Sequence, residues 1–293
     1  MSPRPTARTL SGPLVFVALT LALTWTSAWL LGSASVTAGP VATRLLRASL
    51  VYVAAVGWQP LAVLLLVRRV LDRDWLDRGG HAMTTRYLAL GIGLPIVLLA
   101  GAAIIDAVFG AGASEVTAPG PSIAPTWIDS ALAVSAFLGV LAVLWVQAIV
   151  EEVAWRGYLL PRLMRALGPW GGLLLHGVLW GACYAPVLLV GAAAEEPWRA
   201  ACFVVTCGLL GALLGWLRLA SGGIAASATC NATLTICAGL PLVLQDMTPP
   251  ILGAVFGPAG WLPMVLAIVV VASRPSLRAA VVTPVRPVAS HLN

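Results

Sequence analysis

VEEVAWRGYLLPRL, residues 150–163, places two adjacent carboxylates at the end of a long apolar run. The run before it, residues 128–150, carries one charged residue, Asp129, at its far edge. An acidic residue at the centre of a bilayer costs roughly 2.5–3.5 kcal/mol on insertion scales, so charges kept in such a place are paired, solvated or functional. Arg156 lies four residues after Glu152, and this spacing predicts an ion pair on one helix face.

The composition of the whole chain is that of a membrane protein. Of its 293 residues, 60% are hydrophobic and 10% are charged, whereas a soluble domain is nearer a quarter charged. The apolar runs are continuous, which favours helices over the alternating pattern of a transmembrane β-barrel. We therefore predict an all-α fold, a polytopic transmembrane helix bundle. We expect about eight spans of roughly 20 residues, at 13–32, 50–67, 87–109, 128–150, 171–190, 200–217, 222–244 and 251–272.

The arginines predict how the bundle is oriented. With the N-terminus inside, fourteen of the seventeen arginines fall in inner segments, and only Arg44, Arg47 and Arg199 fall in outer ones. Both termini are therefore predicted to be cytoplasmic, in a multi-pass protein of the cell membrane. The net charge of +6 follows from this topology signal, so we expect no nucleic-acid partner. The first apolar run is too long for a typical signal peptide, and we expect a retained helix.

Three segments resemble the motifs of a family of membrane proteases. EEVAWR, residues 151–156, resembles the first motif, EExxxR, of the CAAX-protease and bacteriocin-processing (CPBP, Abi-like) family, and the continuation to residue 163 resembles one branch of it. WGACYAP, residues 180–186, resembles the second motif, WGxWHxP. Residues 223–235 resemble the third motif, a Gly-Ser turn that leads to HxxxN. The order and spacing of the three segments agree with the family.

The resemblance implies a division of the chain into four parts. Residues 128–244 would form the protease core, preceded in residues 1–127 by three transmembrane helices and their loops. A last transmembrane helix would follow in residues 245–272. Residues 273–293, which contain three prolines, would form a disordered cytoplasmic tail.

The resemblance also implies roles for the residues at the motif positions. In the family, the first glutamate activates a water, and histidines orient that water or stabilise the oxyanion. Glu151 would then be the base, and the pair of Glu152 and Arg156 would hold its helix. The histidine positions of the second and third motifs hold Tyr184 and Asn231 in this chain. A tyrosine O–H and an amide N–H both donate hydrogen bonds, so an oxyanion hole without histidine is chemically feasible.

Two further residues lie on the helix face of the second motif. His176 and Trp180 precede Tyr184 by eight and four residues, so the three share one face of a helix. We take His176 and Trp180 as candidate substrate-binding residues, with ordinary packing or hydrogen bonding inside the bundle as the alternative. Thr235 stands where the third motif of the family has its asparagine.

The sequence gives no reason to expect a cofactor or a metal. The chain has three histidines, His81, His176 and His291, and none of them stands at a motif position. Zinc needs three or four converging ligands. Cys183 and Cys230 neighbour the replaced histidine positions, but on a helix adjacent side chains point about 100° apart.

The function implied by the resemblance is a membrane-embedded endopeptidase. It would cleave membrane-associated protein or lipidated peptide substrates in the lipid bilayer with a glutamate-activated water. The missing histidines favour a second interpretation, a catalytically inactive relative that serves as a membrane scaffold or peptide-binding protein. A third interpretation is a transporter or lipid-binding bundle. The sequence does not clearly show the broken helices or repeated halves that are typical of transporters. Hydrolysis requires Glu151, Tyr184 and Asn231 to converge within the reach of one water.

Overall fold

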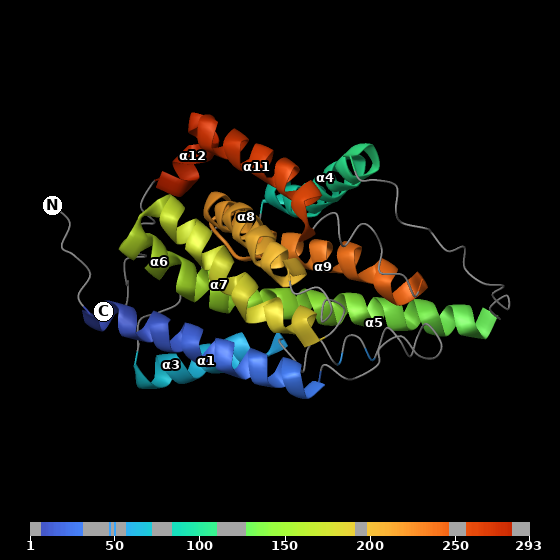
Figure 1. Ribbon diagram of the computed structural model, residues 1–293, viewed down its shortest axis with the longest axis horizontal. Helices are drawn as coiled ribbons and strands as arrows, with labels where there is room; N and C mark the ends of the chain where they lie inside the picture. Colours follow the sequence, from blue (N-terminus) through green and yellow to red (C-terminus); the bar gives the residue numbers. More distant parts are fainter. Residues whose placement is uncertain are drawn as a thin grey trace.

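The computed structural model describes residues 7–31, 47, 50, 57–71, 84–109, 127–190, 198–245 and 256–282. These residues form a bundle of helices without a strand among them (Figure 1). The elements are α1 (Ala7–Leu31), α3 (Gln59–Val70), α4 (Thr85–Phe109), α5 (Trp127–Glu152), η2 (Val153–Leu159), α6 (Leu160–Leu167), α7 (Pro169–Val190), α8 (Trp198–Ser221), α9 (Ala225–Gln245), α11 (Pro258–Ser273) and α12 (Pro275–Val282).

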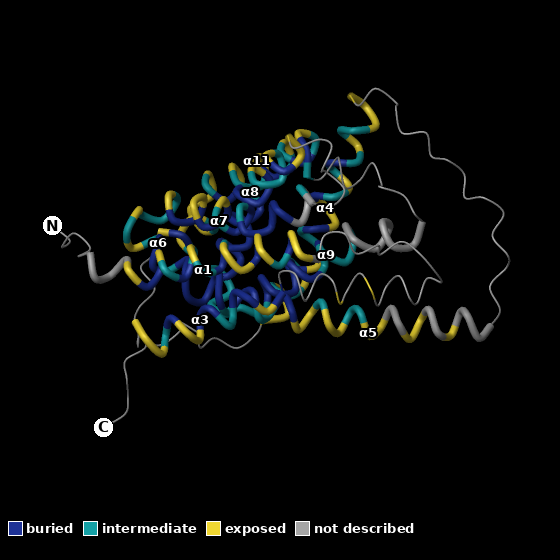
Figure 2. Tube along the Cα trace, turned by 60° about the horizontal axis from the view of Figure 1, so that its bottom comes forward, coloured by how far each residue is buried: buried dark blue, intermediate teal, exposed yellow. Residues whose placement is uncertain are grey.

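Several described helices are long and apolar enough to cross a membrane. Four segments meet both requirements: Ser11–Leu30, Thr85–Phe109, Leu138–Leu167 and Trp198–Ser221. The pair of α11 and α12, bent by 87°, gives a fifth candidate. Buried residues gather in the middle of the bundle and exposed residues lie on its outer faces (Figure 2). Many of the exposed residues are large and apolar. The all-α membrane bundle is thus confirmed, while the number of spans and the side on which the termini lie stay predictions.

The structure describes the later part of the second predicted span. We predicted residues 50–67 with Pro60 inside the helix, and α3 covers Gln59–Val70 with Pro60 in its first turn. Proline is tolerated there because the first helical N–H groups have no partner within the helix. Residues 51–56 lie outside the described part of the chain.

The predicted disordered tail also needs a correction. We expected disorder from Ser273 onward, but residues Pro275–Val282 form α12. Trp216 of α8 donates a hydrogen bond from Nε1 to the carbonyl oxygen of Leu277, 3.1 Å away, and Val281 is buried. Contacts with α8 therefore hold this short helix. The rest of the tail, residues 283–293, lies outside the described residues.

A π-helical segment follows the two glutamates. α5 ends at Glu152, η2 covers the next seven residues, and α6 continues to Leu167. Single π-helical turns inside helices occur frequently at functional sites. Gly168 then adopts φ 78°, the left-handed conformation that favours glycine, and the chain turns directly into α7.

Small residues let α7 and α8 approach closely. A Cβ atom on Gly177 would overlap the backbone of Cys207 and Gly208 on α8, and a Cβ atom on Gly211 would overlap Gly177. Close backbone approach at glycines is typical of helix packing in membranes. α7 thus packs closely on α8, and α9 packs against α5.

Candidate functional site

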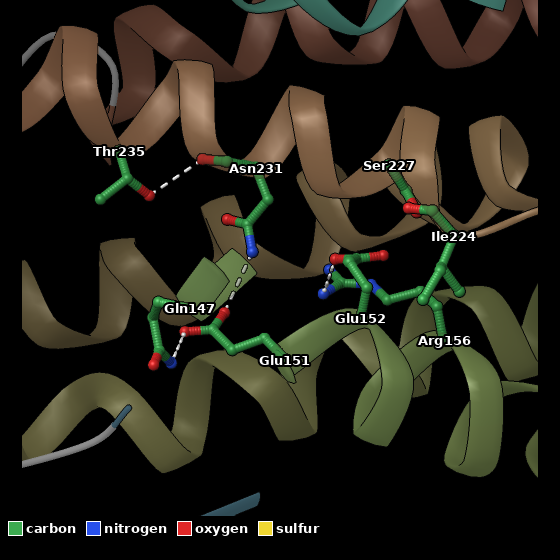
Figure 3. A network of polar contacts seen from close by, with 8 residues as sticks. All are labelled: Gln147, Glu151, Glu152, Arg156, Ile224, Ser227, Asn231 and Thr235. Carbon is green, nitrogen blue, oxygen red and sulfur yellow. Dashed lines mark hydrogen bonds and ion pairs between the residues drawn. The ribbon is translucent and has the colours of Figure 1, made fainter. Parts of the chain in front are cut away.

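Glu151 lies in the last turn of α5 and is held from two sides. Its side chain is 1% exposed. Asn231 of α9 donates from Nδ2 to Glu151 Oε2 over 3.0 Å, and Gln147 of α5 donates from Nε2 to Glu151 Oε1 over 3.0 Å. Figure 3 shows the two amides on either side of the carboxylate. The third motif segment therefore reaches the first directly, and both oxygens of Glu151 accept a hydrogen bond.

Glu152 and Arg156 form a separate pair one step along the chain. Arg156 Nη1 lies 2.7 Å from Glu152 Oε1, and both side chains are fully buried. The ion pair that we predicted from the spacing is confirmed. Ser227 of α9 lies beside this pair in Figure 3, and its hydroxyl donates to the carbonyl oxygen of Ile224 over 3.1 Å. Removing one partner of a buried ion pair is costly, since the other charge is left uncompensated.

Two candidate residues of α7 approach the site through Arg156. The guanidinium carbon of Arg156 lies 4.4 Å from the centroid of the Trp180 ring, a cation–π contact. The rings of Trp180 and Tyr184 are 6.0 Å apart, with an angle of 66° between their planes. The structure therefore brings Tyr184 to the Glu152–Arg156 pair by way of Trp180, whereas Asn231 contacts Glu151 itself.

His176 lies on the same face of α7 but contacts η2. Its fully buried ring lies edge-on to Trp155, with 6.3 Å between the ring centroids and 71° between the planes. Trp155 packs in turn against Phe16 of α1. The contact of the His176 ring with Trp155 is that of a residue packed inside the bundle. The substrate-binding role of His176 stays a prediction.

Several buried donors near Arg156 make no hydrogen bond with another protein group. They are Nε and Nη2 of Arg156, Nε1 of Trp180 and Nε1 of Trp155. A buried donor without a partner costs about 1–3 kcal/mol, and such groups in proteins commonly bind ordered water. These atoms can therefore bind water or the carbonyl oxygens of a peptide.

One family model matches the core of the chain. The model is described as type II CAAX prenyl endopeptidase Rce1-like, and it matches residues 133–237. Residues 133–237 are thus similar to this Rce1-like family. The matched segment contains both glutamates, Arg156, Tyr184 and Asn231, and it lies within the protease core that we predicted at residues 128–244. No curated protein matches the chain.

Within the Rce1-like segment and the other described residues, no three His, Cys, Asp or Glu side chains lie close enough together to hold a metal ion. Cys183 and Cys230 are fully buried free thiols. His81 and His291 lie outside the described residues. Our expectation of a site without zinc therefore stays a prediction.

Sequence reasoning missed two residues of this site. Gln147 lies one helical turn before Glu151, and Gly57, whose carbonyl oxygen also accepts a hydrogen bond from Gln147 Nε2, precedes the Rce1-like segment by many residues. A polar residue at i−4 within an apolar helix was a usable signal for Gln147, since polar side chains inside membrane helices are often functional. Nothing in the sequence pointed to Gly57.

Proposed function

We propose that the protein is an endopeptidase of the cell membrane, of the CAAX-protease type, which cleaves membrane-associated proteins or lipidated peptides with a water activated by Glu151. One observation carries the proposal: a buried carboxylate of the first motif meets an amide donor of the third, across two helices. That arrangement puts a base and a donor next to each other, as peptide hydrolysis requires.

Glu151 supplies the base in this reaction. Each carboxylate oxygen has more than one acceptor position, so Glu151 can accept a proton from water while it keeps its two amide partners. The water oxygen attacks the carbonyl carbon of the scissile peptide bond as the proton moves to Glu151. When the tetrahedral intermediate collapses, the C–N bond breaks and Glu151 returns the proton to the leaving amine.

Asn231 is the first candidate to stabilise the oxyanion. Its amide nitrogen carries two hydrogens, and one of them points to Glu151. The second hydrogen is a donor for the developing oxyanion of a substrate bound beside Glu151. Tyr184 and the free donors of Arg156 and Trp180 line the adjoining part of the site. Removing one donor of an oxyanion hole typically lowers the rate by about 100- to 1000-fold.

The burial of Glu151 has a consequence for substrate entry. Glu151 is 1% exposed. A peptide and its water therefore reach it only after helices around the α5–α9 contact move apart. Closure of the bundle around the peptide would exclude bulk water, which strengthens the electrostatic interactions within the site. We expect opening and closing to form part of each catalytic cycle.

Peptide cleavage by the full-length protein tests the proposal. The protein would be reconstituted in liposomes with a farnesylated peptide that ends in a CAAX sequence, and membrane-protein termini would be compared in cells with wild type, Glu151→Gln or neither. Asp106→Asn on α4 is the matched control, since it also neutralises a carboxylate in an apolar helix but lies outside the site. Wild type and Asp106→Asn should create new termini that are missing with Glu151→Gln.

A second candidate function is a membrane scaffold or peptide-binding protein that does not cleave. The residues Tyr184 and Asn231 favour it, because they stand where the family motifs have histidines. Identical termini from equally abundant wild type and Glu151→Gln, together with no cleavage of the peptide, would support this binding role and refute hydrolysis.

A further inference from the structure

Gln147 makes two contacts that connect the base to a distant part of the chain. It lies on α5 and is buried among apolar helices. Its Nε2 atom donates to Glu151 Oε1 over 3.0 Å and also donates to the carbonyl oxygen of Gly57. An amide nitrogen has two hydrogens, so both donors of Gln147 are used.

The Gln147 amide occupies the space that a side chain at Gly57 would need. A Cβ atom built on Gly57 would lie 2.5 Å from Oε1 and 2.8 Å from Cδ of Gln147, closer than a Cβ atom is found to other atoms. The three atoms nearest to that position all belong to Gln147. Gly57 is not among the described glycines with positive φ, so its backbone conformation accepts other residues. The constraint at Gly57 therefore comes from the Gln147 side chain.

The two amides together fix the carboxylate of Glu151. Asn231 fixes Oε2 from α9, while Gln147 fixes Oε1 from one turn earlier on α5. A glutamate with one partner can still rotate about its last side-chain bond, and a second partner on the other oxygen prevents this. Small displacements of a catalytic group, of about 1 Å, can lower the rate by about 100-fold.

We propose that Gln147 is a positioning residue for Glu151, and that Gly57 sets the position of Gln147. This inference rests on the proposed function, because it assigns Gln147 a part in the reaction of Glu151. Gly57 lies outside the segment that matches the family model, so a part of the chain ahead of the matched core contributes to the site.

Steady-state cleavage of the farnesylated CAAX peptide by full-length protein in liposomes tests the role of Gln147. Gln147→Met keeps the length of the side chain and removes its donors, and we expect kcat to fall about 10- to 100-fold with little change in KM. The matched control is Gln59→Met. Gln59 is also fully buried, and its Nε2 donates a hydrogen bond, 3.2 Å long, to Ser27 Oγ. Equal kcat values for the two variants would overturn the proposal.

Gly57→Ala tests the same inference from the other side. The added methyl group displaces the Gln147 amide, so we expect kcat to fall although Gly57 does not touch Glu151. In a Gln147→Ala background the same substitution finds free space and should lower kcat no further. Effects of Gly57→Ala and Gln147→Ala that multiply, instead of overlapping, would overturn the link between the two residues.

A stability measurement separates failure of this inference from failure of the proposed function. Gln147→Met should lower the Tm more in the wild-type background than in the Glu151→Ala background, because only the wild type has the hydrogen bond between the two side chains. Equal shifts would overturn the contact even if the protein cleaves peptides. Unequal Tm shifts in a protein that cleaves no peptide would support the contact between Gln147 and Glu151 but refute hydrolysis. The catalytic part of the inference would then fail as well.

Discussion

Asn231 Nδ2 donates a hydrogen bond of 3.0 Å to Glu151 Oε2. The two residues are 80 positions apart in the sequence, and their bond joins α9 to α5. It makes a motif residue of α9 the direct partner of the glutamate that ends α5. Thr235, one turn further along α9, donates instead to the backbone carbonyl oxygen of Asn231, 2.9 Å away. Of Asn231 and Thr235, Asn231 is thus the one that reaches the carboxylate.

Substitutions of Asn231 should therefore change the rate of cleavage. Asn231→Ala removes the donor to Glu151, and we expect kcat to fall by about 100- to 1000-fold. Asn231→Asp should be worse, because it brings a second carboxylate to within 3.0 Å of the first. Initial rates of peptide cleavage at matched protein abundance measure both effects. Thr235→Val is the control, and a loss as large as that of Asn231→Ala would contradict the role of the amide.

The Glu152–Arg156 pair should contribute strongly to stability. Both side chains are fully buried, so Arg156→Met leaves an uncompensated carboxylate and should destabilise the fold by about 3–5 kcal/mol. The double variant Arg156→Met with Glu152→Gln removes both charges and should recover part of the loss. Reversible unfolding in detergent measures the three free energies. A double variant less stable than Arg156→Met would contradict this explanation.

The contact between Arg156 and Trp180 predicts a graded series. A cation 4.4 Å from an aromatic centroid in a buried site contributes about 2 kcal/mol. Trp180→Phe keeps an aromatic face and should lower the Tm less than Trp180→Leu, which removes it. If Trp180 also binds substrate, both variants should raise KM for the peptide. An unchanged KM together with the graded Tm would assign Trp180 to packing.

The close approach of α7 and α8 predicts that Gly177 cannot be enlarged. A Cβ atom there would lie 2.8 Å from the carbonyl oxygen and 2.9 Å from the Cα atom of Gly208, both backbone atoms that cannot move aside. We expect Gly177→Ala to reduce the amount of folded protein and its Tm. Gly139→Ala on α5 meets nothing within 4 Å and is the matched control. Similar Tm values for the two variants would show that the helices separate easily.

The sequence alone determined the features that depend on solvent and on local spacing. An apolar chain in lipid must satisfy its backbone hydrogen bonds internally, so the continuous apolar runs already required a helix bundle. The ion pair of Glu152 and Arg156 was equally predictable, because helix geometry makes residues four positions apart neighbours. The three motif segments likewise gave the resemblance to the family whose model matches residues 133–237.

Only the tertiary structure decided which motif residues meet. Asn231 reaches Glu151, whereas Tyr184 is joined to Arg156 through Trp180. The contact between Gln147 and Gly57 could not be predicted either. Periodicity fixes neighbours within one helix, but contacts between helices depend on the rotation and depth of each helix. Side-chain packing over the whole bundle sets that rotation and depth, and no local pattern in the sequence records them.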